Sequence, residues 1–570
     1  MKRVVWLLLS LVVTMLACTS AGELFSGPAP TPTRAAFVAT DVPVPDGMLT
    51  VERIRSRGYL LVGVRYDLRP FGYVDAQGEV TGFDPDLGRE LARRWLGSSD
   101  AVRFQQVRSD TAVEHLQTGQ VDLVIAALPH RQNLEAGADF SDPYFLDGQA
   151  ILVRAADTTM LTGPASLHER RVGVVDGSAS AAALLAAAPV TPTLQTYDRF
   201  DAAVAALGRG DVDAVADERR RLFWGAQLLP TAVVVGQYTQ APLALAFREN
   251  DPAFANLVNL TLQEMLVDGT YAALYAQWFA PEQSPALAVW SGSELPTLAD
   301  AALAAGTPDT IGAIQSRGRL SVALISNRAP FAYVDETGAP AGYEVNLVRL
   351  MAERWLGDPT AVDFTPVTYE AGVELVRTGQ AELLLGGQAH TRAAELALDF
   401  SLPTYWDGES LMVMAGGPEV TDLHSLSGQQ VVVVEASASS DVLLAATQPA
   451  GIPLTILPRQ TLEAATAMLM EGQAAAVAGK RSALLWPAYA TPGLGLLPLR
   501  LTLEPLALGL PQGDSAFRDL VNLTLQVMKA DGQLDALYAV WFSDGPLEME
   551  VWSGAAYRTL RLATAPPPAQ

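Results

Sequence analysis

The stretch Ile54–Gly58 reads I-R-S-R-G, and Ile314–Gly318 reads I-Q-S-R-G, a displacement of 260 residues. The displacement holds for four further segments of the first copy: Pro70-Phe71, Gly82-Phe83, Trp95-Leu96-Gly97 and Asp139-Phe140-Ser141. The register then drifts slightly, so that Asn259–Gln263 matches Asn522–Gln526. Matches this long and ordered indicate duplication of a unit of about 240 residues, far longer than a solenoid repeat. The repeat therefore predicts two whole domains.

The repeat and the local composition divide the chain of 570 residues into six parts. These are a signal segment 1–18, a Pro/Thr-rich tether 19–49, a first domain 50–287, a linker 288–308, a second domain 309–548 and a C-terminal tail 549–570. A hydrophobic content of 49% is ample for two cores. Because Cys18 is the only cysteine, no disulfide can form within the chain.

The first residues read as an export signal. Lys2 and Arg3 precede an apolar run, Val4–Leu16, that is short for a membrane span. Met15-Leu16-Ala17-Cys18 resembles a bacterial lipobox, in which the cysteine is lipidated and anchors the protein to the cell membrane. An uncleaved anchor and an ordinary secretory signal are the alternatives. All three interpretations place the folded part outside the cytoplasm.

Charge and residue spacing argue against several function classes. The net charge of -24 repels phosphate backbones, so no nucleic acid partner is expected. We identify no Ser-His-Asp set, metal-ligand spacing or Walker-type loop, and the five histidines are scattered. Asp84 and Asp86 could be proposed as catalytic acids, but two acids at the start of a helix are the simpler interpretation. We therefore predict no catalytic residues, no metal and no cofactor.

Each unit alternates short apolar runs with amphipathic stretches. Buried strands are predicted at Leu60–Val64, Val121–Ala126, Arg171–Val175 and Val212–Ala216. Phe83, Leu87, Leu91 and Trp95 recur every four residues, as on one face of a helix. Strands separated by helices predict an α/β fold with parallel sheets covered by helices. Ligands of such sheets bind outside the carboxyl ends of the strands.

Six marks occur in a fixed order: Pro70-Phe71, Gly82–Leu87, Asp139–Tyr144, Gly173–Ser178, Asp213–Asp217 and Asp268–Tyr271. With them each copy, 50–285 and 310–546, resembles the amino-acid-type (family 3) periplasmic solute-binding proteins. The resemblance implies two tandem periplasmic-binding-protein-like type II domains, each of two α/β lobes that close about a hinge. By analogy, 50–150 and 245–285 form one lobe, 155–240 the other, and the hinge strands lie near Ala150–Val153 and Leu243–Ala246.

The same resemblance implies the receptor of an ABC importer for amino acids or related small polar solutes. Its partners would be a separate permease and ATPase, together with the membrane through the lipid anchor. A lipoprotein that senses ligand for a membrane sensor, or that serves as a scaffold, is the alternative from the residues alone. An extracellular enzyme similar to the dehydratases with related two-lobed domains is a less favoured alternative.

An α-amino acid presents an ammonium and a carboxylate, and the resemblance suggests groups for both. Asp217 stands where the family places the acid that binds the ammonium; the alternative is a helix N-cap. Gly177 and Ser178 precede the Ala-rich stretch 179–188, so their N–H groups could bind a carboxylate. A tight turn with a serine cap is the alternative.

Other candidates depart from the family pattern. Arg131 is the candidate carboxylate fork, but it stands nine residues before Phe140 where the family has six, and a surface arginine fits equally. Phe71 is predicted near the cleft rim, with a core position as the alternative. Leu68 stands where the family has a ligand-stacking aromatic ring.

The second copy departs further from the family. Gly479, followed by Lys480 and Arg481, stands where Asp217 stands in the first copy. Losing the acid and gaining cations argues against a ligand that carries an ammonium. Arg392 and Phe331 remain its candidate binding residues. We expect the second domain to bind an anion, or nothing.

Overall fold

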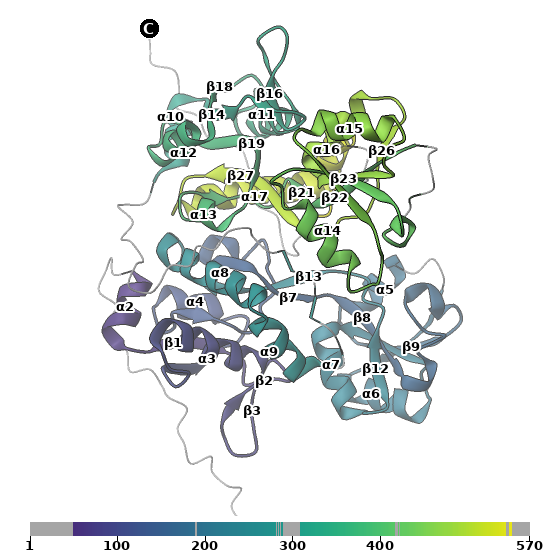
Figure 1. Cartoon of the computed structure of the whole chain (residues 1–570). Helices are drawn as coiled ribbons and strands as arrows, with labels where there is room; N and C mark the ends of the chain where they lie inside the picture. Colours follow the sequence, from purple (N-terminus) through teal and green to yellow (C-terminus); the bar gives the residue numbers. More distant parts are fainter. Residues whose placement is uncertain are drawn as a thin grey trace, which may run out of the picture.

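The computed structural model describes residues 49–187, 191–280, 282, 284–285, 287–288, 308–415, 420, 422–542 and 547–549. The predicted signal segment with Cys18, the tether up to residue 48, most of the linker and the tail beyond residue 549 lie outside the described residues. The described chain forms two α/β domains, and each has two lobes that lie side by side (Figure 1). The predicted fold class is confirmed.

Lobe 1 of domain 1 is built on a five-stranded sheet with the order β5-β1-β6-β13-β7. The same part of the chain also forms a small three-stranded sheet with the order β2-β3-β4. The elements are α2 (Thr50–Arg57), β1 (Leu60–Val64), β2 (Asp67–Leu68), β3 (Gly72–Val74), β4 (Val80–Thr81), α3 (Phe83–Leu96), β5 (Val102–Gln106), α4 (Ala112–Gln117), β6 (Leu123–Val124), η1 (Glu135–Gly137), β7 (Asp139–Asp147), β13 (Ala241–Phe247), α8 (Pro252–Val267) and α9 (Thr270–Phe279).

Lobe 2 of domain 1 carries the second five-stranded sheet, with the order β10-β9-β11-β8-β12. It is formed by the chain between the two passages that connect the lobes. The elements are β8 (Gln149–Arg154), η2 (Ala155–Asp157), η3 (Pro164–Leu167), β9 (Arg171–Val175), α5 (Ser180–Ala187), β10 (Thr193–Tyr197), α6 (Phe200–Arg209), β11 (Ala214–Glu218), α7 (Arg219–Leu228) and β12 (Ala232–Val235).

Domain 2 repeats both sheets, with the orders β18-β14-β19-β27-β20 and β24-β23-β25-β22-β26. In its first lobe β21 also pairs with β27. The first-lobe elements are α10 (Thr310–Arg317), β14 (Leu320–Ile325), β15 (Asn327–Arg328), β16 (Ala332–Val334), β17 (Pro340–Ala341), α11 (Tyr343–Leu356), β18 (Val362–Val367), α12 (Tyr369–Arg377), β19 (Leu383–Ala389), α13 (Arg392–Glu395), β20 (Asp399–Phe400), β21 (Tyr405–Asp407), β27 (Glu504–Leu510), α17 (Ser515–Ala530) and α18 (Gln533–Trp541). The second-lobe elements are β22 (Glu409–Met414), η4 (His424–Leu426), β23 (Gln430–Val434), α14 (Ser439–Thr447), β24 (Thr455–Arg459), α15 (Leu462–Met470), β25 (Ala476–Lys480), α16 (Arg481–Ala490) and β26 (Leu494–Leu496).

The sheets are mixed, which corrects the prediction of purely parallel sheets. In domain 1, β1 pairs in parallel with β5 and β6, and β9 pairs in parallel with β10 and β11. The strands that flank the passages between lobes run the other way: β13 is antiparallel to β6 and β7, and β8 to β11 and β12. Apolar runs mark a buried strand but carry no information on its direction, so the sequence could not reveal this.

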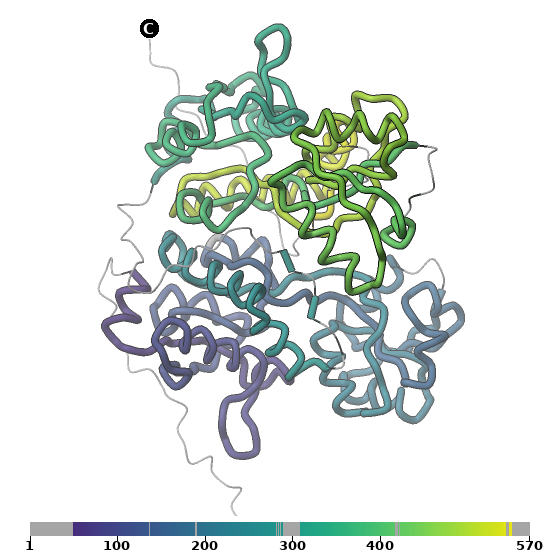
Figure 2. Tube along the Cα trace, viewed as in Figure 1, coloured from purple at the N-terminus to yellow at the C-terminus, as the bar shows by residue number. Residues whose placement is uncertain are grey.

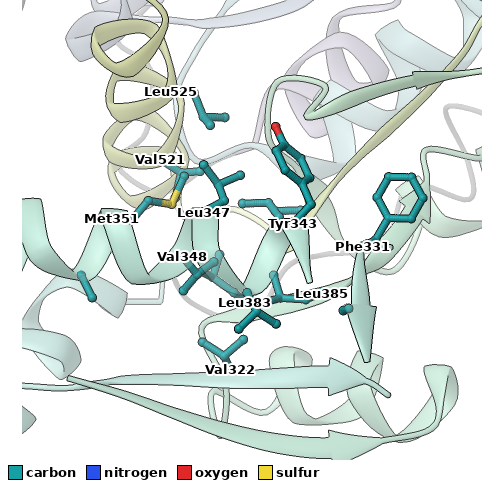
Figure 3. Packing of buried hydrophobic residues seen from close by; sticks show 14 of the residues in the cluster. Val322, Phe331, Tyr343, Leu347, Val348, Met351, Leu383, Leu385, Val521 and Leu525 are labelled. Carbon is teal, nitrogen blue, oxygen red and sulfur yellow. The ribbon is translucent and has the colours of Figure 1, made fainter. Parts of the chain in front are cut away.

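The predicted apolar face of the helix packs into the core of the first lobe. Phe83, Leu87 and Leu91 of α3 are fully buried. In domain 2 the equivalent residues Tyr343, Leu347 and Met351 of α11 lie against α17 and the strands of the first-lobe sheet (Figure 3). Burial of such a side chain contributes about 1.5–3 kcal/mol, so these rows fix the helices on their sheets.

The two passages between the lobes touch at a glycine in each domain. Gly148, between β7 and β8, has φ +147°, and an added Cβ would overlap the carbonyl oxygen of Thr239 in the return passage. The next N–H, that of Gln149, donates to Thr239 Oγ1 at 2.7 Å. Gly408 repeats this contact with Thr502 in domain 2. Only glycine can bring two backbones this close in this conformation.

The hinge differs in position from the prediction. Ala150–Val153 lies inside β8 of lobe 2, and Leu243–Ala246 lies inside β13 of lobe 1. The passages themselves fall at Gly148 and at residues 236–240. Analogy with the family led to the strands that adjoin the passages, and the short passages themselves leave no apolar signal in the sequence.

The two domains dock through the same elements of each copy: α8 of domain 1 faces α13 of domain 2, and α17 of domain 2 faces η1 and the start of β7 in domain 1. Ser515 Oγ donates to Asp139 Oδ2 at 2.9 Å, and Asn250 N donates to Ser515 Oγ at 2.8 Å. On the other side, Asn259 Nδ2 donates to Glu395 Oε1 at 3.1 Å. Contacts between equivalent faces make the interface a pseudo-two-fold, isologous one.

Each domain brings a matching set of a histidine, an acid and an aromatic ring to this interface. His130 pairs with Glu135 and stacks on Phe140. In domain 2 His390 Nε2 lies 2.7 Å from Glu395 Oε2, and the ring of His390 stacks on Phe400. Both groups line the space between the domains. The pseudo-symmetry therefore extends to individual side chains.

We expect Gly148→Ala to lower the free energy of unfolding by about 3 kcal/mol or more, because the substitution adds both backbone strain and overlap at the crossing. Urea unfolding of the full chain measures the loss. Gly97→Ala is the matched control: φ is +80° there, but an added Cβ meets nothing within 4 Å, so only about 1–2 kcal/mol of strain is expected. Equal losses in the two variants would show that contact at the crossing contributes nothing.

Candidate functional site

A pocket of about 490 Å³ opens between the two lobes of domain 1. Such a volume lies within the range of small-ligand sites, about 300–1,000 Å³. We call it the cleft pocket. Both lobes supply its walls, which comprise Tyr66, Asp67, Leu68, Arg69, Tyr73 and Val74 of lobe 1, and Arg199, Phe200, Asp201, Arg221, Trp224 and Leu228 of lobe 2.

Arg69 connects the two walls of the cleft pocket. Its guanidinium carbon lies 3.9 Å from the ring centroid of Tyr73, in its own lobe, and 5.3 Å from that of Trp224, in the opposite lobe. Cation–π contacts of this kind are worth about 0.5–2 kcal/mol. Sequence reasoning missed both Arg69 and Trp224, since the contact joins distant segments with no shared motif.

Asp217 lies near the carboxyl end of β11 and is fully buried, without lining the cleft pocket itself. Arg221 Nη1 lies 3.2 Å from its Oδ1 and 3.1 Å from its Oδ2, and Glu218 N donates to Oδ1 at 2.7 Å. Burial raises the pKa of Asp217 to about 6, although Arg221 opposes the shift. Asp217 does not cap α7, whose N-cap is Glu218 and has no side-chain cap bond. The alternative role as a helix cap is therefore not realised.

Arg221 joins the buried acid to the pocket. It lies one helical turn after Asp217, its guanidinium packs over the ring of Phe200 at 4.9 Å, and its side chain lines the cleft pocket. The carboxylate is thus already paired by a cation of its own lobe. A ligand ammonium reaching Asp217 must replace this guanidinium. The run Arg219-Arg220-Arg221, which begins two residues after Asp217, was the signal available in the sequence.

The turn at Gly177 and Ser178 lies between β9 and α5. Gly177 is exposed with φ +67°, and Ser178 donates from both N and Oγ to Val175 O, at 3.2 and 2.7 Å. The Ser178 hydroxyl thus closes a turn, as in the alternative interpretation. The turn ends two residues before α5 and lies outside the walls of the cleft pocket.

Phe71 and Phe331 are core residues in this structure. Phe71 is fully buried, with ring centroids of Phe145 and Phe279 at 4.9 and 5.4 Å. Phe331 is 3% exposed and packs against Tyr405 at 5.2 Å. The predicted position of Phe71 at the cleft rim is wrong, and its alternative, a core position, is the one observed; Phe331, a candidate binding residue of the second domain, is likewise a core residue. Leu68, in the place of the family's aromatic ring, does line the cleft pocket.

The two candidate arginines are not brought to a cleft. Arg131 is exposed and lines neither the cleft pocket nor the space between the domains. Arg392 is 1% exposed, and its Nη1 lies 2.7 Å from Glu264 Oε2 of domain 1. Arg392 thus contributes to the docking of the domains, a role that a single-domain pattern could not predict. Leu134 stands six residues before Phe140, where the family has its arginine.

The second cleft lacks the buried acid. Gly479 of β25 faces Ser410 of β22, as Asp217 of β11 faces Ala150 of β8. Lys480 is paired with Glu504, and Arg481 Nη1 donates to Leu497 O at 2.7 Å. Alignment of the two strands makes Arg481 the counterpart of Arg219 in domain 1. Lys480 is therefore the only cation gained here by domain 2, which corrects the sequence interpretation that both Lys480 and Arg481 are gained.

In each domain a buried acid near the start of a helix, Asp84 of α3 or Glu344 of α11, is hydrogen-bonded within lobe 1. Asp84 Oδ1 accepts from Tyr144 Oη at 2.8 Å, and that hydroxyl accepts from Ala127 N at 3.2 Å. In domain 2, Glu344 Oε2 accepts from Gly386 N and Gly387 N at 2.7 and 3.0 Å. In domain 1 the acid thus holds the segment that follows the central strand β6, and in domain 2 it holds the irregular part of the central strand β19.

Two further features of the described residues concern metals and membranes. Within the described ranges, no group of three or more His, Cys, Asp or Glu side chains is arranged to hold a metal ion. None of the helices that the structure describes is both long and apolar enough to cross a membrane.

Two α/β lobes, a double passage between them and a ligand-sized cleft define a two-lobed binding domain. The chain belongs to the bacterial extracellular solute-binding proteins, family 3, whose model matches residues 60–281 and again 320–544. It is a tandem pair of such domains, as the repeat predicted, and a solute-binding protein.

Several known proteins are similar to one copy. The ABC transporter glutamine-binding protein GlnH of Bacillus subtilis is 29% identical over 40% of this chain and 84% of its own length. The glutamine-binding protein of Geobacillus stearothermophilus is 33% identical over 31% and 68%. The L-cystine-binding protein TcyJ of Escherichia coli is 26% identical over 42% and 88%. Among solved structures, an ancestral cationic amino acid solute-binding protein is 33% identical, covers 40% of this chain and 99% of its own, and has a TM-score of 0.37.

Asp84 gives the protein a defined pH dependence. Burial raises the pKa of Asp84 from 3.8 to about 7, so the folded state keeps a proton that the unfolded chain releases above about pH 4. The free energy of unfolding therefore falls as pH rises through this window, by at most about 1.4 kcal/mol per pH unit from this group.

Asp84→Asn removes this proton, so we expect a shallower pH dependence and a more stable protein at pH 8. Urea unfolding of the full chain from pH 4.5 to pH 8 tests this. Glu344→Gln should act alike in domain 2, since burial also raises the pKa of Glu344 to about 7. A slope unchanged by Asp84→Asn would contradict the assignment.

Proposed function

We propose that the chain is an extracytoplasmic lipoprotein that captures an amino acid, or a related small polar solute, in the cleft of domain 1 and delivers it to an ABC importer. The observation that carries the proposal is Asp217, a fully buried carboxylate at the end of a lobe 2 strand, reached from the cleft pocket through Arg221. A carboxylate in this position suits an ammonium group. It acts in binding, and we assign no enzymatic step to it.

The geometry suggests an exchange of partners during binding. The ligand ammonium takes the place of the Arg221 guanidinium on Asp217, so the acid stays paired throughout and avoids the cost of a buried unpaired charge. The released guanidinium already lines the cleft pocket, where it can pair with the ligand carboxylate. Arg221 would thus serve in place of the family's arginine, whose position is occupied by Leu134 in this chain. The N–H groups at Gly177 and Ser178 remain a second proposed carboxylate contact.

The similar proteins support the class of ligand. The two glutamine-binding proteins and the cystine-binding protein are named for amino acids that carry both an ammonium and a carboxylate. Closure of the two lobes would complete the site, with Arg69 and Trp224 in contact across the pocket. We propose that Cys18 anchors the protein by its lipid, so that the tether holds domain 1 near its permease.

A sensory role is the second candidate, and the observation that favours it is the missing acid of domain 2. Gly479 cannot pair with an ammonium, so the second domain is free for another task, such as presenting the ligand state of domain 1 to a membrane sensor. Deletion of the gene separates the two roles. Loss of solute uptake supports import, whereas loss of a solute-dependent transcriptional response with uptake intact supports sensing.

Calorimetric titration of the full chain with L-glutamine, L-cystine, L-histidine, L-arginine and L-glutamate should find a ligand that binds with one site per chain. Asp217→Asn should weaken that ligand about 100-fold, or about 2.7 kcal/mol, because a buried charge pair is lost. Asp201→Asn is the matched control, since Asp201 also lines the pocket but pairs with Arg199 at the surface. Unchanged affinity in Asp217→Asn would exclude the proposed site.

Affinity for the same ligand should depend on pH through Asp217. Only the ionised carboxylate pairs with an ammonium, and its pKa in the free protein is about 6. Below that pH the ionised fraction falls tenfold per pH unit, so the affinity should fall about tenfold per unit as well. It should level off above pH 7. Titrations from pH 4.5 to pH 8 test this, and a flat profile in the unmodified chain would contradict it.

A further inference from the structure

The face at which α17 of domain 2 packs against η1 of domain 1 gathers four buried acids around one arginine. Figure 2 shows the two halves of the chain, purple to teal and green to yellow, lying against each other. Arg518 of α17 pairs with Asp139 of domain 1, and its Nη1 lies 3.4 Å from Asp399 Oδ2. Glu135 and Asp519 are the other two acids, and all four are at most 7% exposed. One positive charge cannot balance four buried negative ones, so some of these carboxyl groups keep a proton.

Two of the four acids, one from each domain, share a hydrogen bond. The carboxyl group of Glu135 in domain 1 is bonded to that of Asp519 in domain 2, and we call the two the carboxyl pair. Ionised carboxylates only accept hydrogen bonds, so this bond requires a proton on one of the two groups. In the part of the chain that the structure describes, the buried Oδ1 of Asp519 has no hydrogen-bond partner. A second negative charge at this place would therefore be poorly stabilised.

The groups around the carboxyl pair favour retention of the proton. Burial is the main cause that raises the pKa of both acids; Asp139 adds to the shift, and Arg518 opposes it. Glu249 of domain 1 is a further acid that faces Glu135. His130 Nε2 pairs with Glu135, but burial lowers the pKa of His130 to about 3. The imidazole therefore brings no positive charge to the acids near neutral pH.

The other side of the pseudo-two-fold interface has an amide in place of one acid. In the aligned sequences of α8 and α17, Asn256 takes the place of Asp519. Glu395, the counterpart of Glu135, accepts from the amide of Asn259 at 3.1 Å. An amide donates a hydrogen bond without taking up a proton. The carboxyl pair is therefore a property of one side of the interface, created by a single difference between the two copies.

We propose that docking of the two domains takes up a proton, which the carboxyl pair holds between them, so that the domains separate as the pH rises. In separated domains both acids face water and release their protons above about pH 5. The docked pair keeps one proton above that pH, so docking is strongest at lower pH and weakens as the pH rises. For one proton the docking constant falls about tenfold per pH unit. This response is independent of the solute.

X-ray scattering of the full chain from pH 6 to pH 9.5 tests the proposal. We expect the radius of gyration to rise with pH as the docking constant falls about tenfold per unit. Asp519→Asn, which copies Asn256, should keep the radius measured at pH 6 throughout, because the amide donates the hydrogen bond without a proton. Glu463→Gln removes an exposed acid of α15 and is the matched control, so its radius should rise as in the unmodified chain.

Two results of this experiment would overturn the proposal. A constant radius in the unmodified chain would show that pH does not control docking. An equal rise in Asp519→Asn would show that general repulsion between the acidic domains, and not the carboxyl pair, separates them.

Urea unfolding of the full chain counts the proton and uses a variant of the other domain. Between pH 7.5 and pH 9.5 Asp84 and Glu344 are largely ionised, so they add little to the slope. We expect the unfolding constant of the unmodified chain to rise by a further factor of about ten per pH unit relative to Glu135→Gln. Equal slopes in the two proteins would show that the carboxyl pair holds no proton, and the proposal would fail.

Discussion

The structure of each domain depends on the point where the two passages between its lobes touch. Gly148 lies against Thr239, and Gly408 lies against Thr502, in a backbone conformation that only glycine adopts readily. The threonine hydroxyl also accepts the next N–H of the other passage, at 2.7 and 2.9 Å. At this crossing the two lobes, and hence the cleft between them, are tied together, alongside contacts such as Phe223 of lobe 2 with Phe145 of lobe 1. The remaining contacts build on that crossing.

Much of the fold could be predicted because a buried element leaves a periodic signal. The strand at Leu60–Val64 and the helix that carries Phe83, Leu87 and Leu91 appear as predicted, since apolar spacing follows directly from burial. Strand direction and hinge position could not be predicted in this way. The passage at Gly148 lacks an apolar run, and the antiparallel strands β8 and β13 look in sequence like the parallel ones.

The site was less predictable because its contacts join distant segments. Position in the family pattern led to Asp217, yet the same pattern could not reveal that Arg221 pairs with it. Phe71 was misplaced because a single aromatic residue after proline fits a rim and a core equally. Arg392 was misplaced for a different reason: its partner Glu264 belongs to the other domain, and a comparison made one domain at a time contains no such partner.

The pseudo-two-fold interface has a consequence for how strong it needs to be. Because one chain carries both copies, docking is intramolecular, which raises the effective concentration of each face for the other. An interface too weak to assemble separate domains would therefore still stay closed in one chain. The two faces are also free to differ, as Arg392 with Glu264 on one side and Arg518 with Asp139 on the other already do. Because the two domains are fused in one chain, their faces no longer have to be complementary to themselves, as the face of an identical subunit in a dimer must be.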